Sequence, residues 1–204
     1  MSDNLGASTP SARVRVRAVA SPVELAQCVD FLAAQFPGSP MPRDVGFYAK
    51  EFALNPALLL LAEVAGQIEG VLLGFVEDDH VLVGGIAISL SLRGQGIGSL
   101  LIDELVRHSR LVGQDTILAG AVEGAEGFYQ RTGFEATLFV QAQGPGAMGA
   151  LEAAAAGHRV LWRDESDTWA KMVIETDGVD RTLQRRLERE VPESHTQYLM
   201  QRHL

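Results

Sequence analysis

The chain is poor in several residue types whose presence would define a class of protein. Its 204 residues include one cysteine, Cys28, so an internal disulfide is excluded and a reducing compartment is expected. No apolar run approaches the roughly 20 residues of a membrane span. Residues 1–12 are polar and unlike a signal peptide. These absences predict a cytoplasmic protein that does not enter a membrane.

Basic residues are scarce as well. Lysine and arginine together number 17 against 26 acidic residues, which gives a net charge of -9. This balance argues against nucleic acid as a partner, because nucleic-acid binding needs basic patches. It suits a cationic partner such as an amine. The five histidines have no metal-ligand spacing, so no metal is expected.

The most distinctive stretch of the chain is a glycine-rich turn, Arg93-Gly94-Gln95-Gly96-Ile97-Gly98-Ser99. The uncharged run 81–90 before it predicts a buried strand, and the i+4 spacing of Ile97, Leu101 and Leu105 predicts a helix. Glycines at a helix N-terminus favour a phosphate or pyrophosphate ligand, although an ordinary strand-to-helix turn can hold glycines too. A dinucleotide fingerprint would need glycine where Ser99 stands, and a nucleoside-triphosphate loop would need a Gly-Lys-Ser/Thr sequence that is absent.

A second segment decides between these interpretations. Residues 116–122 predict another strand, and the segment that follows ends in Phe128-Tyr129 and Gly133-Phe134. The two motifs together resemble the GNAT family of N-acetyltransferases. The family's first motif, Arg/Gln-x-x-Gly-x-Gly/Ala, is matched by Arg93, Gly96 and Gly98, and its second is Phe-Tyr-x-x-x-Gly-Phe. Their order, their separation and the strand before each make the resemblance specific over about residues 13–140.

The resemblance implies a fold, a cosubstrate and a site. Family members have a mixed central sheet with helices on both faces, and they use acetyl-CoA. The implied pyrophosphate site is the backbone of Arg93, Gly94, Gln95, Gly96, Ile97, Gly98 and Ser99. The implied pantetheine site is the backbone of Ile86, Ala87 and Ile88, and an N–H near Ile88 would polarise the thioester carbonyl. Tyr129 matches the family's tyrosine near the thioester sulfur, as a cofactor contact and general acid.

The sequence departs from the family pattern at the general base. Residues 83–85 hold no acid where many relatives carry a glutamate, and Val122 stands where many carry an asparagine. Acidic residues and a histidine cluster at 77–80, and Glu123 follows the next predicted strand. Each is better explained as a solvated turn residue than as a base. The base therefore stays unassigned.

The pattern along the chain predicts an α/β protein in three parts: a disordered tail at 1–12, a GNAT-like acyl-CoA N-acyltransferase domain at 13–143, and a small α/β extension at 144–204. A capping box at Ser21 begins the first helix, and residues 43–54 form the second. From the strand near Leu138 onward, the element order is βαββαβ, the ferredoxin-like pattern. Alternatively, residues 198–204 supply the last strand of the core sheet, and 144–195 are an insertion.

The function expected from the sequence is an acetyl-CoA-dependent N-acetyltransferase. It would transfer an acetyl group directly to a primary amine of a small-molecule or peptide acceptor. The alternative is a non-catalytic acyl-CoA-binding or assembly module on the same fold, which the missing acid favours and Tyr129 opposes. The apolar stripe within 179–191 must be covered, either by the core or by a second copy in a homodimer.

Overall fold

The computed structural model describes residues 13–37 and 44–204. The chain forms two compact units. The first unit comprises Met1–Phe75 and Gly84–His108, of which residues 1–12 and 38–43 lie outside the described part, and the second comprises Val76–Val83 and Ser109–Leu204. The predicted tail therefore falls on residues that the structure does not describe.

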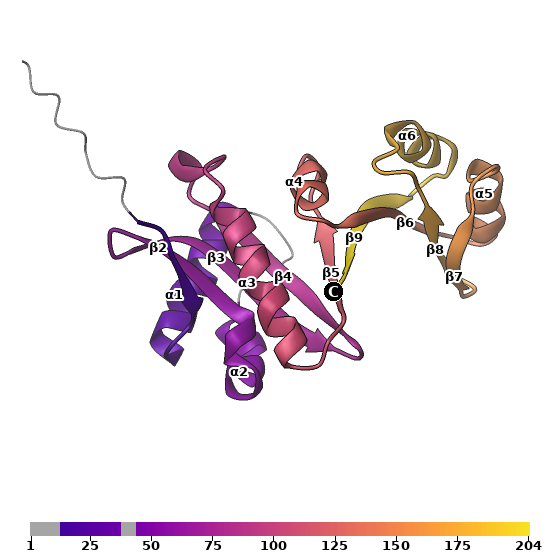
Figure 1. Ribbon diagram of the computed structural model, residues 1–204. Coiled ribbons are helices and arrows are strands. Elements are labelled where there is room, and N and C mark those ends of the chain that lie inside the picture. The colour runs from indigo at the N-terminus through magenta and orange to yellow at the C-terminus, as the bar shows by residue number, and fades with distance from the viewer. Residues whose placement is uncertain (1–12, 38–43) are drawn as a thin grey trace, which may run out of the picture. The chain divides into compact units, whose positions relative to one another are not determined.

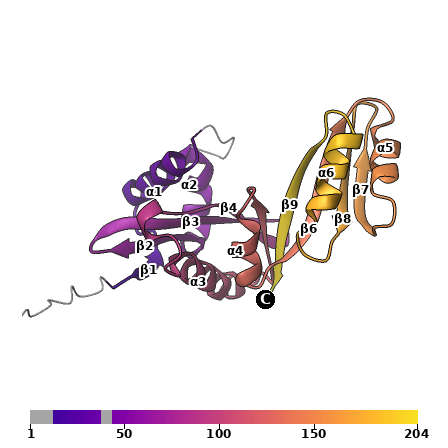
Figure 2. The ribbon, with the colours of Figure 1, turned by 90° about the horizontal axis from the view of Figure 1, so that it is seen from above.

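The first unit is a sheet with helices on both faces. Its elements are β1 (Arg15–Ala18), α1 (Pro22–Gln35), α2 (Val45–Leu54), the 3-10 turn η1 (Pro56–Leu58), β2 (Leu59–Val64), β3 (Gln67–Glu77), β4 (His80–Ile88), the 3-10 turn η2 (Leu90–Leu92) and α3 (Ile97–Leu111). The last residues of β3 and α3 and the first of β4 belong to the second unit. The strands lie in the order β1-β2-β3-β4, with α1 and α2 on one face and α3 on the other (Figures 1 and 2).

The local signals in the sequence explain where α1 and α2 begin and end. The Ser21 Oγ accepts a hydrogen bond from the N–H of Glu24 at 3.2 Å, which is the predicted N-cap. The predicted second helix begins at Val45, after the Asp44 cap, and ends at Leu54 before Asn55-Pro56. Its predicted start at residue 43 lies outside the described residues.

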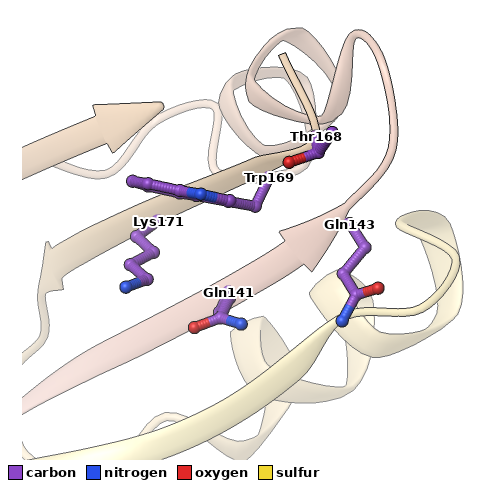
Figure 3. A pocket seen from close by; sticks show the side chains of 5 residues that line it. All are labelled: Gln141, Gln143, Thr168, Trp169 and Lys171. Carbon is purple, nitrogen blue, oxygen red and sulfur yellow. The ribbon is translucent and has the colours of Figure 1, made fainter. Parts of the chain in front are cut away.

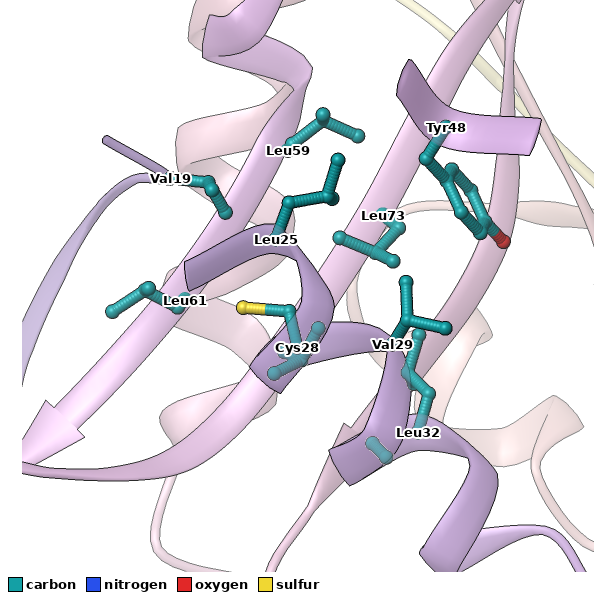
Figure 4. Close-up of a cluster of buried hydrophobic side chains, with 11 residues drawn as sticks. Val19, Leu25, Cys28, Val29, Leu32, Tyr48, Leu59, Leu61 and Leu73 are labelled. Atoms are coloured by element: carbon teal, nitrogen blue, oxygen red, sulfur yellow. The ribbon is translucent and has the colours of Figure 1, made fainter. Parts of the chain in front are cut away.

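The core of the first unit lies between α1, α2 and the sheet (Figure 4). It consists of apolar side chains from all of these elements: Val19, Leu25, Cys28, Val29, Leu32, Tyr48, Leu59, Leu61, Val71, Leu73 and Ala87. Cys28 is buried and packs as a small hydrophobe, as its place in the apolar stripe predicts. Its burial raises the pKa of the thiol to about 12.

The prediction for residues 81–90 was wrong in two respects. The strand ends at Ile88, and Leu90 is 73% exposed at the start of a 3-10 turn. Within β4 the residues alternate between buried and half-buried, whereas a continuous apolar run predicts burial on both faces. Apolar composition alone cannot reveal that only one set of side chains is fully covered.

The second unit carries the rest of the chain on a mixed sheet. Its further elements are β5 (Thr116–Ala121), α4 (Glu126–Arg131), β6 (Glu135–Gln143), α5 (Ala147–Ala154), β7 (Val160–Glu165), β8 (Trp169–Glu175), α6 (Arg181–Glu190) and β9 (His195–His203). The strand order in this unit is β4-β5-β9-β6-β8-β7. Figure 2 shows α5 and α6 on the same face of the β6–β9 strands.

The last six elements combine the two arrangements that the sequence left open. From β6 to β9 the order is βαββαβ, and the strands lie as β9-β6-β8-β7 with every neighbour antiparallel, which is the ferredoxin-like pattern. On its other edge β9 also pairs with β5, from Thr116 opposite His203 to Ala121 opposite Tyr198. The final strand is thus shared by the core strands and the C-terminal elements. Among the described residues, no helix combines the length and apolar character needed to span a bilayer.

Candidate functional site

The glycine turn of the first unit places backbone donors at the start of α3. Gly94 and Gly96 have φ of 78° and 84°, a region that side chains rarely adopt. The Leu100 N–H donates to the Gly96 carbonyl at 3.1 Å, which is the first hydrogen bond of the helix. The N–H groups of residues 97–99 therefore have no partner within the helix. Because no atom lies within 4 Å of an added Cβ at either glycine, the approach to the turn is open.

The turn is fixed to the sheet by two isoleucines over a third glycine. A Cβ added at Gly70 of β3 would lie 2.8 Å from Ile88 Cδ1 and 3.2 Å from Ile97 Cγ2. Gly70 thus lets both side chains pack directly on β3, and Ile97 is buried. The end of β4 and the first residue of α3 are held together in this way.

Arg93 braces the same turn. Its Nε donates to the Ile88 carbonyl at 3.1 Å, and its Nη2 donates to Gln35 Oε1 at 3.4 Å. The side chain thereby ties the turn to the last residue of β4 and to the last residue of α1. The guanidinium remains exposed and places positive charge beside the helix N-terminus.

The part of β4 implied for the pantetheine arm lies beyond the ladder to β5. That parallel ladder runs from Val81 to Val83 and stops there. A Cβ on Gly84 would lie 2.7 Å from the Tyr48 hydroxyl, so the missing side chain at Gly84 lets Tyr48 of α2 approach β4 closely.

The second motif forms α4 and its C-terminal cap, in the second unit. The Phe134 N–H donates to the Tyr129 carbonyl at 3.1 Å, and the Gly133 N–H donates to the Gln130 carbonyl at 3.0 Å. With φ of 84° at Gly133, these bonds form a Schellman motif, whose usual apolar contact is the ring of Phe134 against that of Tyr129 at 5.3 Å. The glycine and the second phenylalanine of the motif therefore have physical roles in ending the helix.

Tyr129 is held between aromatic neighbours. Its side chain is 4% exposed and contacts Phe128 and Phe134 edge to face. Burial raises the pKa of the hydroxyl above its usual value near 10, so the group is protonated at neutral pH. The hydroxyl forms no hydrogen bond with any residue of 13–37 or 44–204. Its ring is fixed while its polar atom is unused by the fold.

Comparison with family models decides which family these motifs indicate. The model of the GNAT acetyltransferase family matches residues 25–134, from α1 through the cap of α4. The chain belongs to the GNAT acetyltransferase family. The resemblance drawn from the sequence is confirmed, together with the mixed α/β fold. Comparison with curated proteins returned no match.

Solved structures share the GNAT fold at low sequence identity. A proposed acetyltransferase from Pyrococcus horikoshii is 13% identical, with a TM-score of 0.54 over 100% of this chain and 93% of that one. The diaminobutyrate acetyltransferase of Paenibacillus lautus, solved with L-2,4-diaminobutyric acid and coenzyme A, is 16% identical, with a TM-score of 0.51 over 83% and 98%. An N-acetylglutamate synthase from Neisseria gonorrhoeae is 16% identical, with a TM-score of 0.51 over 95% of this chain and 35% of that one.

The acidic residues weighed as a base in this GNAT protein lie in turns. Asp78 has φ of 51° between β3 and β4, and the Asp79 side chain is 99% exposed. The only described partner of Asp79 is His80, at 3.3 Å. Glu77 and Glu123 are exposed as well. These placements agree with solvated turn residues and assign no base.

Sequence reasoning missed two buried acids, Glu51 and Glu126, and the first lies on α2. Glu51 of α2 is 7% exposed, and its Oε1 is buried without a hydrogen-bond partner among the described residues. The Tyr48 hydroxyl, one helical turn earlier, is also buried without such a partner. The available signal was spacing, since residues i and i+3 share a helix face and Tyr48 faces the core.

The second unit also has a polar hollow on the strands β6 and β8 (Figure 3). It has a volume of about 290 Å³ and is lined by Gln141, Gln143, Thr168, Trp169 and Lys171. The Lys171 ammonium lies 4.6 Å from the centroid of the Trp169 ring, a cation–π contact. None of the residues predicted for the cosubstrate lines this hollow.

Proposed function

We propose that this GNAT protein transfers the acetyl group of acetyl-CoA to a primary amine. The observation that carries the proposal is the glycine turn at the start of α3, whose open backbone donors suit a pyrophosphate. Arg93 adds a positive charge there. In this proposal the pyrophosphate binds the backbone of Arg93–Ser99, and the pantetheine binds the backbone of Ile86–Ile88.

The proposed reaction is direct transfer. The amine nitrogen attacks the thioester carbonyl carbon, the C–N bond forms, and the C–S bond breaks to release the thiolate. A main-chain N–H near Ile88 stabilises the developing oxyanion. The Tyr129 hydroxyl gives its proton to the thiolate, and its raised pKa keeps that proton available at neutral pH. The amine loses its own proton to a base that the described residues do not identify.

A second candidate is a non-catalytic acyl-CoA-binding or assembly module. It is favoured by residues 83–85, which hold no acid, and by the exposure of the acids at the β3–β4 turn. It is opposed by Tyr129, whose buried ring and unused hydroxyl suit a proton donor.

The test is release of free thiol from acetyl-CoA in the presence of candidate acceptors. The acceptors are simple amines, polyamines, amino acids, aminoglycosides and peptides, and the product mass identifies the acetylated atom. Thiol release that depends on one of these acceptors supports the proposal. Acetyl-CoA binding measured by calorimetry, without acceptor-dependent thiol release, supports the module instead. The Gly96→Glu variant serves as the control for binding at the turn.

We also propose separate roles for two parts of the chain. Residues 13–143 act as the acetyltransferase domain and 144–204 as an extension that stabilises it or joins two copies. A cytoplasmic location is proposed from the single cysteine. Sedimentation of the full chain tests the homodimer, and fractionation of cells tests the location.

A further inference from the structure

The helix that carries Tyr129 is too short to hold its own position. α4 has six residues, and no side chain caps its first turn. Isolated helices of this length are not stable in water, so tertiary contacts must fix α4. The contacts to its two ends come from the C-terminal part of the chain.

The first end of α4 is held by an ion pair. The Glu126 side chain is 5% exposed, and its Oε1 lies 2.7 Å from Arg181 Nη2 at the start of α6. Its Oε2 accepts a hydrogen bond from the Gly124 N–H at 2.9 Å, just before the helix. A buried carboxylate requires such partners, because an unpaired charge in the interior is costly.

Arg181 is itself fixed in place. Its Nη1 donates to Gln184 Oε1 at 2.5 Å, and its guanidinium carbon lies 5.4 Å from the ring centroid of Tyr198. Asp180 caps α6 by accepting from the backbone N–H groups of Thr182 and Leu183, each at 2.9 Å. The ion pair thus connects α4 to an ordered helix terminus and not to a free surface arginine.

The other end of α4 is held by a second arginine. Arg202 of β9 donates from Nη1 to the Thr132 carbonyl at 2.5 Å. The Thr132 Oγ1 donates in turn to the Tyr129 carbonyl at 2.9 Å. Tyr129 lies between the two anchors and, at i+3 from Glu126, on the same side of the helix.

We propose that Arg181 and Arg202 are positioning residues that aim the Tyr129 hydroxyl at the reacting thioester. The inference rests on the proposed function. Neither arginine touches a reacting atom in this proposal. They act by fixing the helix, because proton transfer needs heavy atoms within about 3 Å and a displacement of about 1 Å lowers the rate. The C-terminal part of the chain is then required for turnover and not only for stability.

The experiment compares Arg181→Gln and Arg202→Gln with Arg185→Gln, each in the full chain. Arg185 is an exposed residue of the same helix α6, so its variant is the matched control. The first measurement is hydrogen–deuterium exchange of the segment 126–134, which needs no activity. We expect faster exchange in both test variants and wild-type exchange in the control. Unchanged exchange in folded test variants would overturn the proposal that the two arginines hold α4 in place.

The second measurement is kcat with the acceptor found in the thiol-release screen, in wild-type and Tyr129→Phe backgrounds. Arg181→Gln should lower kcat by at least about tenfold with the KM for acetyl-CoA unchanged, and by less than twofold once the hydroxyl is gone. The pair variant Glu126→Gln with Arg181→Met removes both charges, so it should regain thermal stability while kcat stays low.

The outcomes separate the two proposals. Equal fold-losses of kcat in both backgrounds, or recovery of kcat along with stability in the pair variant, would make the arginines structural and overturn the positioning role. If the wild type transfers no acetyl group to any acceptor, the proposed function fails and Tyr129 loses its role. The exchange measurement then still decides whether the two arginines hold α4.

Discussion

Replacing Tyr129 with phenylalanine tests the proposed general acid with little disturbance of the fold. The ring packs edge to face on Phe128 and Phe134, and these contacts remain in the variant. The hydroxyl has no hydrogen-bond partner in the described part of the chain, so its removal breaks no internal bond. The free energy of unfolding should therefore change by less than about 1 kcal/mol. Acetyl-CoA affinity should be unchanged as well.

The expected effect is on turnover. Loss of a general acid lowers the rate by about 10²- to 10⁴-fold. A thiolate with a pKa near 8.5 leaves partly without assistance, so we expect a rate loss at the low end of this range. That loss is about 100-fold, or about 3 kcal/mol in the barrier. Because burial raises the Tyr129 pKa above its usual value near 10, the acid form persists as pH rises. Wild-type kcat should thus show no loss from Tyr129 ionisation below pH of about 10.

The assay is kcat at saturating acetyl-CoA and acceptor, under conditions in which single-turnover and steady-state rates agree. Tyr48→Phe is the control, because it also removes a buried tyrosine hydroxyl that has no partner among the described residues. A fall of less than about threefold in Tyr129→Phe, or an equal fall in Tyr48→Phe, would refute the acid assignment.

Four further predictions test other parts of the structure. Gly96→Glu should abolish acetyl-CoA binding in calorimetry while the protein stays folded, because a φ of 84° is strained for glutamate and the charge of the new side chain repels pyrophosphate. Unchanged affinity in a folded variant would contradict the assignment of the pyrophosphate site to this turn. A chain that ends at Gln143 lacks β9 and exposes the edges of β5 and β6, so it should aggregate in size-exclusion chromatography, and a soluble, equally stable product would contradict this. Glu51→Met should raise the urea midpoint, since one carboxylate oxygen is buried without a partner among the described residues; a lower midpoint would indicate a partner for that oxygen. Cys28, with a pKa of about 12, should resist thiol reagents at pH 8 until the protein unfolds, and rapid labelling of the native protein would contradict its burial.

Much of the fold was predictable because its signals are local. The cap at Ser21 and the end of the second helix at residue 54 depend on neighbouring residues and were predicted correctly. The turn between β2 and β3 is local as well, because it depends on Gly66, where φ is 80°. Such features follow from the conformational preferences of a few residues and need no knowledge of the tertiary structure.

The errors and omissions concern pairing across the sequence. Nothing local indicates that β9 lies between β5 and β6, since its partners are 54 or more residues away. The single-faced burial of β4 depends likewise on which helices cover it. Glu51 was missed because a lone acid on an amphipathic helix is usually solvated. A contact map is needed to find such residues.

The contacts of α4 explain why a family motif can be necessary without being sufficient. The motif sequence around Tyr129 encodes the Schellman cap and the aromatic packing, which fix the local conformation. It does not encode where the helix lies, because six residues cannot hold a helix by themselves. That information comes from Arg181, 55 residues beyond Glu126, and from Arg202, 70 residues beyond Thr132. A chain with the motif intact but these arginines lost would keep the motif's local conformation and lose the position of its hydroxyl.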